Sequence, residues 1–422
     1  MSAPRLLYLA WGFPPAAKSC AYRMLATANA FVRSGWDVTV LTLTESAWLR
    51  EQGLDRSLSG LVDPRIVVER LPLFREDLET DIRTYAEERA INPGRWLRQH
   101  RIEDEQQFPE PVFGRWHDEL IASARELSDR FHPDLVLTSA TPYTFFAPAH
   151  DLWQRDGIPY VLDYRDAWAI DILRDTPAFA PGSRAGLLEA QYIEHATEAW
   201  FVNQPIRDAY ADLYPSSAAK LHILRNGSDV AVGTSRIPLR KPQADQGLTF
   251  GYLGTVTFDA RRMHALCEGW RLAAADNEII RRSTLVFRGH LGTGSARGVT
   301  PQAAIIAAHE RYGVSFGGPV AKADTAAVYE SWDALVLSIV GGRYVTSGKV
   351  FDYISTGLPV MSVHEWDHAA VEILEDYPLW VRNDGVEAED LAEAFIQTAE
   401  LSINASIDDR HHARRYAERF ER

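Results

Sequence analysis

The chain has 422 residues, of which 46% are hydrophobic and 24% charged, and its formal net charge at pH 7 is −14. This composition is that of a soluble globular protein of two or three domains and excludes disordered and fibrous proteins. The negative charge argues against non-specific nucleic-acid binding, which depends on neutralising phosphates. The two cysteines, Cys20 and Cys267, are far apart. They exclude a disulfide framework and a cysteine-rich zinc site, and they fit a reducing compartment.

The apolar runs of the chain are short. None approaches the about 18 residues that span a membrane, and the first, residues 6–11, is too short for the core of a signal peptide. We therefore expect a cytoplasmic protein with at most a peripheral association with a membrane.

The first half alternates short apolar runs with amphipathic stretches. Residues 6–10 and 37–43 predict strands, and residues 22–31 between them have a helical spacing that ends at Gly35. Strand, helix and strand in this order predict a parallel βαβ unit. Further strands are predicted at residues 134–137, 159–163, 199–202 and 222–224.

A polar, charged segment with a helical pattern, residues 75–130, predicts a helical insertion on the first sheet. Residues 238–247 are polar and contain proline, which predicts a linker. After this linker the alternation restarts, with strands predicted at residues 248–253, 284–287, 314–316, 334–338 and 359–363.

The predicted fold class is α/β, with two Rossmann-like parallel-sheet domains that face an interdomain cleft. The first domain is expected at residues 1–237 and the second at residues 248–405. Residues 406–422 predict a C-terminal helix, for which packing back on the first domain is one arrangement. In such sheets, ligands bind beyond the carboxyl ends of the strands.

The strongest local signal lies in residues 345–360. A Gly341–Gly342 loop leads to Ser347, a good N-cap, and a helix is predicted from about Lys349 to Gly357. The amino end of a helix attracts anions, and Lys349 there opposes the helix dipole unless an anion is bound. Asp352, one turn later, could accept both hydroxyls of a ribose. The structural alternative is a capped surface helix with a Lys–Asp pair.

Two other segments lie at the carboxyl ends of predicted strands. The first is Phe-Gly-Tyr-Leu-Gly-Thr at residues 250–255, where Gly254 would allow a ligand close to the backbone. Arg261 and Arg262 come soon after it. The second is Asp-Tyr-Arg-Asp-Ala-Trp at residues 163–168. The alternatives are a plain strand-end turn for the first and a buried ion pair of Arg165 with a carboxylate for the second.

Three further patterns are expected to be structural. His364 and His368 match His-Glu-x-x-His, but they follow a strand, whereas the zinc motif requires a helix. Residues 292–298 resemble a dinucleotide fingerprint with the wrong spacing, and we expect a loop there. His195 is expected to be a structural histidine. No Asp-x-Asp occurs in the chain, so the metal dyad of cation-dependent sugar transferases is missing.

These residues together resemble the two-domain GT-B glycosyltransferases, specifically the family 4-like group. Trp-Gly-Phe-Pro-Pro at residues 11–15 is similar to that group's loop after strand one, which usually faces the acceptor. Residues 31–40 and 163–168 resemble two further segments of the first domain. Asn-Gly-Ser-Asp at residues 226–229 resembles the segment before the linker.

The second domain resembles the same group in its donor-binding segments, residues 251–255 and 349–359. Of the family's paired glutamates, the second matches Asp352, whereas the first falls on Tyr344. The family often has arginine where this chain has Thr255, and Lys349 could replace that charge. Many members have His-Asp where this chain has Arg165 and Asp166.

The resemblance implies a hexosyltransferase-type enzyme of carbohydrate biosynthesis. It would move a sugar from a nucleotide diphosphate to the hydroxyl of a carbohydrate, lipid-linked or small-molecule acceptor, with retention of configuration and with no metal or other cofactor. The alternatives are a nucleotide-sugar 2-epimerase of the same architecture and a non-catalytic nucleotide-sugar-binding partner.

The resemblance also implies roles for individual residues. The residues assigned to catalysis are Asp166, Lys349 and Arg261. Donor binding is assigned to Gly254, Thr255, Ser347, Gly348 and Asp352, and acceptor binding to Phe13 and Arg165. Arg261 and Lys349 would hold the diphosphate with the Ser347 and Gly348 amides.

Overall fold

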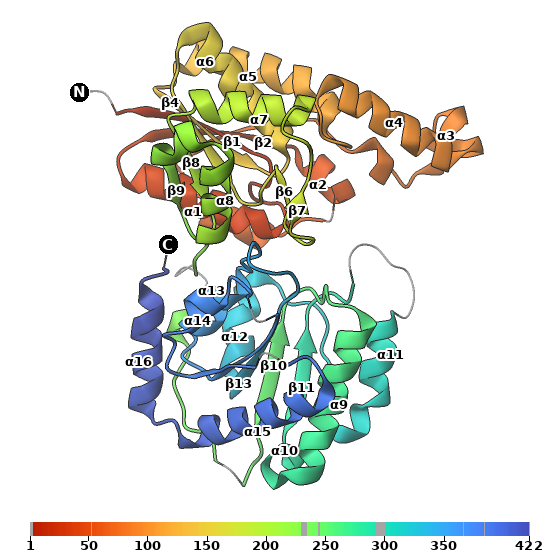
Figure 1. Ribbon diagram of the computed structural model, residues 1–422, viewed down its shortest axis with the longest axis vertical. Coiled ribbons are helices and arrows are strands. Elements are labelled where there is room, and N and C mark those ends of the chain that lie inside the picture. The colour runs from red at the N-terminus through yellow and green to blue at the C-terminus, as the bar shows by residue number, and fades with distance from the viewer. Residues whose placement is uncertain are drawn as a thin grey trace. The chain divides into compact units, whose positions relative to one another are not determined.

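The computed structural model describes residues 3–51, 53–228, 234–243, 245–292, 300–365, 367–383 and 385–421. The chain divides into two compact units, Met1–Arg225 and Asn226–Arg422, and each is built around a parallel β-sheet (Figure 1). The predicted fold class of two parallel-sheet domains is confirmed. The Asn-Gly-Ser-Asp segment and the pattern at residues 292–298 lie only partly within the described residues.

The first unit contains a seven-stranded sheet in the order β3-β2-β1-β4-β5-β8-β9. Its strands are β1 (Arg5–Ala10), β2 (Asp37–Leu43), β3 (Val67–Leu71), β4 (Leu135–Ala140), β5 (Tyr160–Tyr164), β8 (Glu198–Phe201) and β9 (Leu221–Ile223). Strands β1 and β5 are almost wholly buried, as expected for parallel strands covered on both faces. The sequence did not predict β3, because this edge strand is only half-buried and its apolar run is broken by Glu69 and Arg70.

The helices of the first unit are α1 (Ser19–Arg33), α2 (Glu45–Glu51), α3 (Glu87–Ile91), α4 (Pro93–Gln107), α5 (His117–Phe131), α6 (Phe146–Asp156), α7 (Arg184–His195) and α8 (Gln204–Leu213). The segment between β3 and β4 is helical, as predicted. Its last helix, α5, packs against α6, whereas α3 and α4 extend away from the sheet (Figure 1). A short hairpin, β6 (Ile170–Asp171) with β7 (Thr176–Pro177), follows β5.

The second unit contains a six-stranded sheet in the order β12-β11-β10-β13-β14-β15. Its strands are β10 (Thr249–Leu253), β11 (Thr284–Arg288), β12 (Val314–Phe316), β13 (Ala334–Ser338), β14 (Val360–Val363) and β15 (Trp380–Val381). All pair in parallel. The sequence predicted all of them except β15, which has only two residues.

Helices cover both faces of this second sheet. One buried cluster joins the sheet to α9 (Ala260–Asp276), α10 (Glu278–Arg282), α11 (Pro301–Ala308) and α15 (Ala388–Asn404). The cluster on the other face joins it to α12 (Thr325–Glu330), α13 (Lys349–Ser355), α14 (Val371–Leu374) and α16 (Ile407–Glu418). The C-terminal helix α16 thus buries Ala413 and Ala417 within the second unit, next to α13.

In both sheets, the order in which the chain adds strands reverses at the first strand. From β1 the chain builds outward to β2 and β3 and then crosses to β4 on the other side, and β10 has the same position between β11 and β13. At such a reversal, the segments that follow two neighbouring strands run in opposite directions along the sheet. This leaves room for a ligand at the carboxyl edge. Among the described residues, no helix has the length and apolar character that crossing a membrane requires.

Candidate active site

The reversal in the second sheet lies between β10 and β13. Gly254 follows β10, and the segment after β13 leads to the amino end of α13 (Figure 1). The segment that contains Lys349 and the Gly254 segment are about 95 residues apart in the chain. Both therefore belong to one edge of one sheet.

Lys349, the first residue of α13, lies directly against Gly254. A Cβ atom on residue 254 would come within 2.0 Å of Lys349 Cε. Lys349 Nζ is 5.7 Å from the centre of the Tyr252 ring, and among the described residues it makes no hydrogen bond or salt bridge. Burial lowers the pKa of this ammonium group, while the nearby Asp352 carboxylate acts in the opposite direction. A partly buried cation without a hydrogen-bond or ion-pair partner indicates a place for an anion.

Asp352 pairs with a residue that the sequence analysis did not identify. Its Oδ2 atom lies 3.0 Å from Nζ of Lys322, and both side chains are mostly buried. Lys322 lies in the short helical turn Lys322–Asp324 that follows β12. The proposed surface pair of Lys349 with Asp352 is therefore replaced by a contact between α13 and the helical turn after β12. Asp352 keeps its place one turn into α13.

Helix α13 begins at Lys349, as predicted, but its N-cap differs by one residue from the prediction. Gly348, not Ser347, occupies the N-cap position, and no side chain caps the helix there. Ser347 Oγ accepts a long hydrogen bond of 3.3 Å from the Lys349 amide. The carbonyl of Thr255 accepts a hydrogen bond from the Tyr252 hydroxyl at 2.8 Å. Ser347, Gly348 and Thr255 thus lie in the loops of this edge, and their predicted roles stay predictions.

The two arginines at the start of α9 point in different directions. Arg261 is 80% exposed and pairs with Glu387 at 2.6 Å, so the structure turns it to solvent. The side chain of Arg262 is only 11% exposed, pairs with Glu365 at 2.8 Å, and donates a hydrogen bond of 2.5 Å to the Ile339 carbonyl after β13. The arginine at the sheet edge is therefore Arg262, and the assignment of Arg261 to the diphosphate needs this correction.

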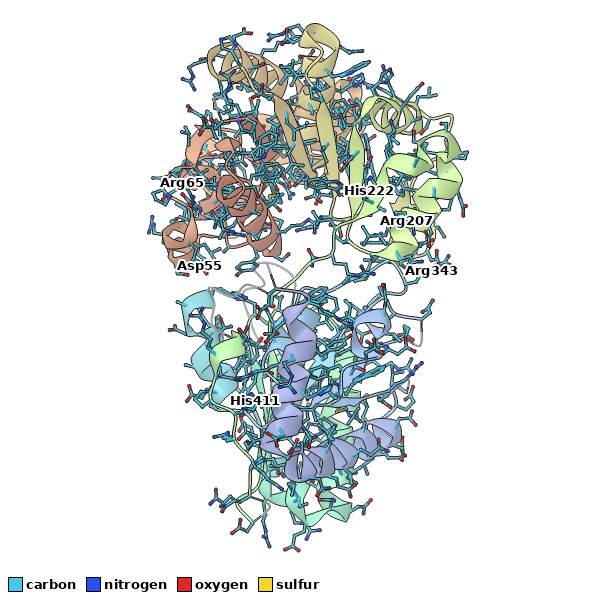
Figure 2. The ribbon with its side chains drawn as sticks, turned by 90° about the vertical axis from the view of Figure 1, so that its left-hand side faces the viewer. Asp55, Arg65, Arg207, His222, Arg343 and His411 are labelled. Carbon is cyan, nitrogen blue, oxygen red and sulfur yellow. The ribbon has the colours of Figure 1, made fainter. Side chains whose placement is uncertain are left out.

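Two further cations of this edge were also missed. Arg288 ends β11, and its Nε atom donates to the Gly318 carbonyl at 3.1 Å. Arg343 lies in the loop after β13, with its guanidinium 4.9 Å from the centre of the Tyr344 ring. Figure 2 shows Arg343 at the end of the second unit that carries these loops. Their positions at or after predicted strands are the signal that could have found both.

In the first unit, the segment after β5 holds Arg165 and Asp166. Their side chains form a partly buried ion pair at 2.8 Å, as the structural alternative proposed. The Tyr143 hydroxyl, which follows β4, donates to the Ala167 carbonyl at 2.7 Å. Asp166 is 34% exposed and remains accessible from solvent, so its assignment as the acceptor-positioning group stays a prediction.

Phe13 does not lie on the surface. Its side chain is completely buried in the core of the first unit, because the loop after β1 folds inward there, and a direct contact with an acceptor in this arrangement is wrong. Beneath the same edge, Arg23 of α1 forms a buried ion pair with Asp163, with its Nε atom 3.0 Å from both carboxylate oxygens. Ser139 Oγ donates to the same carboxylate at 2.7 Å.

The contacts of His364 and His368 are those of structural histidines. His364 and His368 are buried after β14, and their ring centres are 5.4 Å apart. His364 Nδ1 lies 2.7 Å from the Glu365 carbonyl, and His368 Nδ1 accepts from the Ala370 amide at 3.0 Å. Burial lowers the pKa of His368 to about 3. Within the described part of the chain, no group of three or more His, Cys, Asp or Glu side chains is placed to hold a metal ion.

His195 ends α7 and is held within the fold. Its Nδ1 atom lies 2.9 Å from the Gln191 carbonyl, and its ring is 4.1 Å from that of Trp153. These contacts are those of the structural histidine that we expected.

Comparison with family models finds one match. The family model of the glycosyl transferase 4-like domain matches residues 20–227. By sequence, no curated protein gives a significant match.

Solved structures with similar folds match along nearly the whole chain. Sucrose-phosphate synthase from Thermosynechococcus elongatus is 14% identical, with coverage of 99% of this chain and 94% of that one and a TM-score of 0.62. The UDP-forming α,α-trehalose-phosphate synthase from Burkholderia vietnamiensis is 12% identical, with 99% and 95% coverage and a TM-score of 0.58. A Listeria monocytogenes protein described as a UDP-N-acetylglucosamine 2-epimerase is 10% identical, with 99% and 95% coverage and a TM-score of 0.54.

The family match lies in the first unit, and the similar folds extend through both sheets. The chain has the GT-B fold, and its residues 20–227 belong to the glycosyl transferase 4-like domain family.

Proposed function

We propose that this protein is a glycosyltransferase that moves a hexosyl group from a nucleotide diphosphate donor to an acceptor hydroxyl, with retention of configuration. The observation that carries the proposal is the packing of Lys349 against Gly254 at the reversal of the second sheet. A partly buried ammonium group that faces a residue without a side chain can contact a phosphate close to the backbone. The UDP-forming trehalose-phosphate synthase of similar fold supports a donor of this chemical class.

The leaving diphosphate gains negative charge as the bond to the sugar breaks. We assign Lys349 and Arg262 to stabilising this charge, with the Ser347 and Gly348 amides as additional donors. Fixed positive groups at the position where charge develops usually supply a large part of the rate enhancement. These groups would perform the task that a metal ion has in cation-dependent transferases, so turnover is expected to survive excess chelator.

Asp352 is assigned to the ribose hydroxyls of the donor, with Lys322 holding the carboxylate in place at 3.0 Å. In the first unit, Asp166 is assigned to positioning or deprotonating the acceptor hydroxyl, and its partner Arg165 to orienting that carboxylate at 2.8 Å. The acceptor is a carbohydrate, a lipid-linked sugar or another small hydroxyl compound.

Calorimetric titration with UDP, GDP, ADP and dTDP tests the donor site. At least one of these is expected to bind, and Lys349→Ala should reduce turnover with the matching sugar nucleotide about 100- to 1000-fold. Lys241→Ala, which removes an exposed lysine, is the matched control. If Lys349→Ala keeps both nucleotide affinity and turnover, the donor site is elsewhere. An epimerised sugar formed without any acceptor would instead show an isomerase.

A further inference from the structure

A short segment between β5 and β6 carries Asp166, and the hydroxyl of a buried tyrosine holds its main chain. We call residues 166–169 the Asp166 segment. Tyr210 of α8 is completely buried, and its hydroxyl accepts hydrogen bonds from the amides of Trp168 and Ala169 at 2.8 and 3.0 Å. This one side chain therefore fixes the second half of the Asp166 segment.

The carboxyl group of Glu189 sets the direction of the Tyr210 hydroxyl. Glu189 lies in α7, is completely buried, and accepts a hydrogen bond from Tyr210 at 2.6 Å. A tyrosine hydroxyl has one proton to donate and can also accept hydrogen bonds. Because its proton points to Glu189, the hydroxyl oxygen presents its acceptor side to the amides of Trp168 and Ala169. Without this acceptor, the proton would compete with those amides for the same space.

A second tyrosine holds the first half of the Asp166 segment. Tyr143 follows β4, and its hydroxyl lies 2.7 Å from the carbonyl oxygen of Ala167 and 3.2 Å from that of Asp166, to which it donates. Its ring also stacks on Trp168, with the ring centres 5.0 Å apart and the planes inclined by 9°. Two tyrosines from different elements thus hold all four residues of the segment.

The carboxylate of Glu110 holds Tyr143 in turn. Its two oxygens accept hydrogen bonds from the main-chain amides of Tyr143 and Thr144 at 3.0 and 2.8 Å. Burial raises the pKa of Glu110 to about 7, although these amides act in the opposite direction. Burying a carboxyl group is costly, yet Glu110 and Glu189 both lie behind the same short segment. Such a supporting layer is typical of a segment that carries a reacting group.

The side chain that this network presents to solvent is that of Asp166. Its carboxylate is 34% exposed and lies 2.8 Å from the guanidinium of Arg165. The residues before it belong to the completely buried strand β5, and the residues after it are held by Tyr143 and Tyr210. Asp166 is therefore an accessible carboxylate on a main chain that is fixed on both sides.

We propose that Tyr210 and Tyr143, set by Glu189 and Glu110, are positioning residues that hold the Asp166 carboxylate in place for the acceptor hydroxyl. They act through the main chain and do not contact the acceptor themselves. The inference rests on the proposed function of Asp166 and adds the residues that determine its position. A displacement of about 1 Å near a reacting group can lower turnover about 100-fold.

Turnover and hydrogen exchange of the full chain test this role. Tyr210→Phe keeps the ring but leaves the amides of Trp168 and Ala169 without an acceptor, so kcat should fall about 10- to 100-fold. The affinity for a nucleoside diphosphate should stay unchanged, because the donor is assigned to the second unit. Turnover is the release of nucleoside diphosphate from UDP-glucose, GDP-mannose, ADP-glucose or dTDP-glucose, with glucose, glucose 6-phosphate or fructose 6-phosphate as acceptor. The Asp166 segment should also exchange its amide hydrogens faster.

Tyr160→Phe is the matched control. Tyr160 of β5 is also completely buried, but its hydroxyl donates to the carbonyl of Tyr192 at 2.6 Å. The control variant loses one buried hydroxyl and should lower the melting temperature to a similar extent as Tyr210→Phe. It should keep the kcat and the hydrogen exchange of the unmodified protein. A Tyr210 with a purely structural role would behave as Tyr160 does.

The two buried glutamates should respond differently to the same substitution. Glu189→Ala should lower kcat, and Glu189→Gln should restore it, because an amide oxygen still accepts from Tyr210. In Glu110→Gln, the new NH2 group faces a main-chain amide of Tyr143 or Thr144, and two donors repel each other. Glu110→Gln should therefore lower kcat, whereas Glu189→Gln should not.

Two outcomes overturn the inference. The first is that Tyr210→Phe and Tyr143→Phe turn over as Tyr160→Phe does. The second, which needs no substrate, is equal hydrogen exchange of the Asp166 segment in Tyr210→Phe and the unmodified protein. Tyr143→Phe leaves the pair of Tyr210 and Glu189 intact, so it preserves the test if Tyr210→Phe does not fold.

Asp166→Asn in the same assays separates this inference from the proposed function. If Asp166→Asn keeps full turnover, the acceptor role assigned to Asp166 is wrong, and the positioning role is wrong with it. If Asp166→Asn loses turnover while Tyr210→Phe and Tyr143→Phe keep it, only the positioning inference fails.

Discussion

Lys349 occupies the space that a side chain on residue 254 would need. The close approach, 2.0 Å between a Cβ atom at Gly254 and Lys349 Cε, joins the end of β10 to the start of α13. Gly254 also has a φ of 137°, a conformation that residues with side chains rarely adopt. The glycine is thus required both by the backbone and by the lysine next to it.

Gly254→Ala should therefore displace the lysine. We expect nucleoside diphosphate affinity to fall about tenfold or more, the scale of one lost charged hydrogen bond. The protein should also lose about 1–3 kcal/mol of stability from backbone strain. Gly318→Ala is the control, because Gly318 has a φ of 73° and open space around its Cα. The Gly318→Ala variant shows the effect of backbone strain alone, without displacement of Lys349. Calorimetry and thermal unfolding measure both effects, and equal nucleotide affinity in the two variants would contradict the assignment.

Substitutions of Arg262 and Arg261 give a second matched pair of variants. Arg262→Ala should weaken nucleotide binding or turnover at least about tenfold, since this guanidinium holds the Ile339 carbonyl and faces the sheet edge. Arg261→Ala should change stability by less than about 0.5 kcal/mol and leave kinetics intact, as for most exposed ion pairs. Steady-state kinetics of both variants decides. Loss of activity only in Arg261→Ala would restore the assignment made from the sequence.

Asp352 should recognise the ribose. Asp352→Ala is expected to lower the affinity for the donor roughly 10- to 150-fold with little effect on kcat, because ribose contacts are the same in the ground and transition states. The preferred nucleoside diphosphate and its 2′,3′-dideoxy analogue provide the test. The unmodified protein should discriminate between them, and Asp352→Ala should not.

Lys322→Ala should have a weaker effect on ribose recognition than Asp352→Ala. It leaves the Asp352 carboxylate in place but removes the ammonium 3.0 Å away. We expect reduced discrimination between the two nucleotides rather than its complete loss. If Lys322→Ala and Asp352→Ala both discriminate as well as the unmodified protein, the ribose lies elsewhere.

Asp166→Asn tests the acceptor side. The substitution keeps the size of the residue and its place beside Arg165, but removes the charge that would attract the acceptor proton. Turnover should fall about 100-fold or more, the scale of losing a general base, while nucleotide affinity stays nearly unchanged. A large loss of nucleotide affinity would show that the donor and acceptor roles were assigned to the wrong units.

Glu189 should make the stability of the protein depend on pH. Its buried carboxyl accepts hydrogen bonds from Tyr210 at 2.6 Å and Tyr214 at 3.0 Å, and burial raises its pKa from 4.5 to about 7 although these hydroxyls act in the opposite direction. The native state thus holds its proton more strongly than the unfolded state. The free energy of unfolding should fall as the pH rises from about 4.5 to about 7, by up to about 3 kcal/mol.

Glu189→Gln removes this titration. The difference in unfolding free energy between Glu189→Gln and the unmodified protein should therefore shift in favour of the variant across that pH range. Denaturant unfolding at several pH values measures it. Glu194→Gln changes an exposed glutamate of the same helix and should show no such trend. A pH-independent difference for Glu189→Gln would mean that its carboxyl does not titrate in this range.

The order of the strands followed from the sequence. Residues 37–43, 314–316 and 334–338 were predicted with the bounds that β2, β12 and β13 have. β2 and β13 are buried on both faces, and continuous apolar runs of strand length are the local signal for such strands. The position of Lys349 at the start of α13 was also predicted, because a Gly–Gly loop before a helical pattern indicates where the helix begins.

Only the tertiary structure decided which of two adjacent residues faces the sheet edge and which distant residues pair. Arg261 and Arg262 differ by about 100° around the helix, so only the packing of α9 through Met263 and Leu266 decides which one faces the sheet edge. The pairing of Lys322 with Asp352 and the burial of Phe13 likewise depend on how the segments after different strands pack together. The sequence determined the elements because local patterns specify them. Only the tertiary structure decided the partners, since contacts between residues distant in the chain arise when the sheet aligns the ends of its strands.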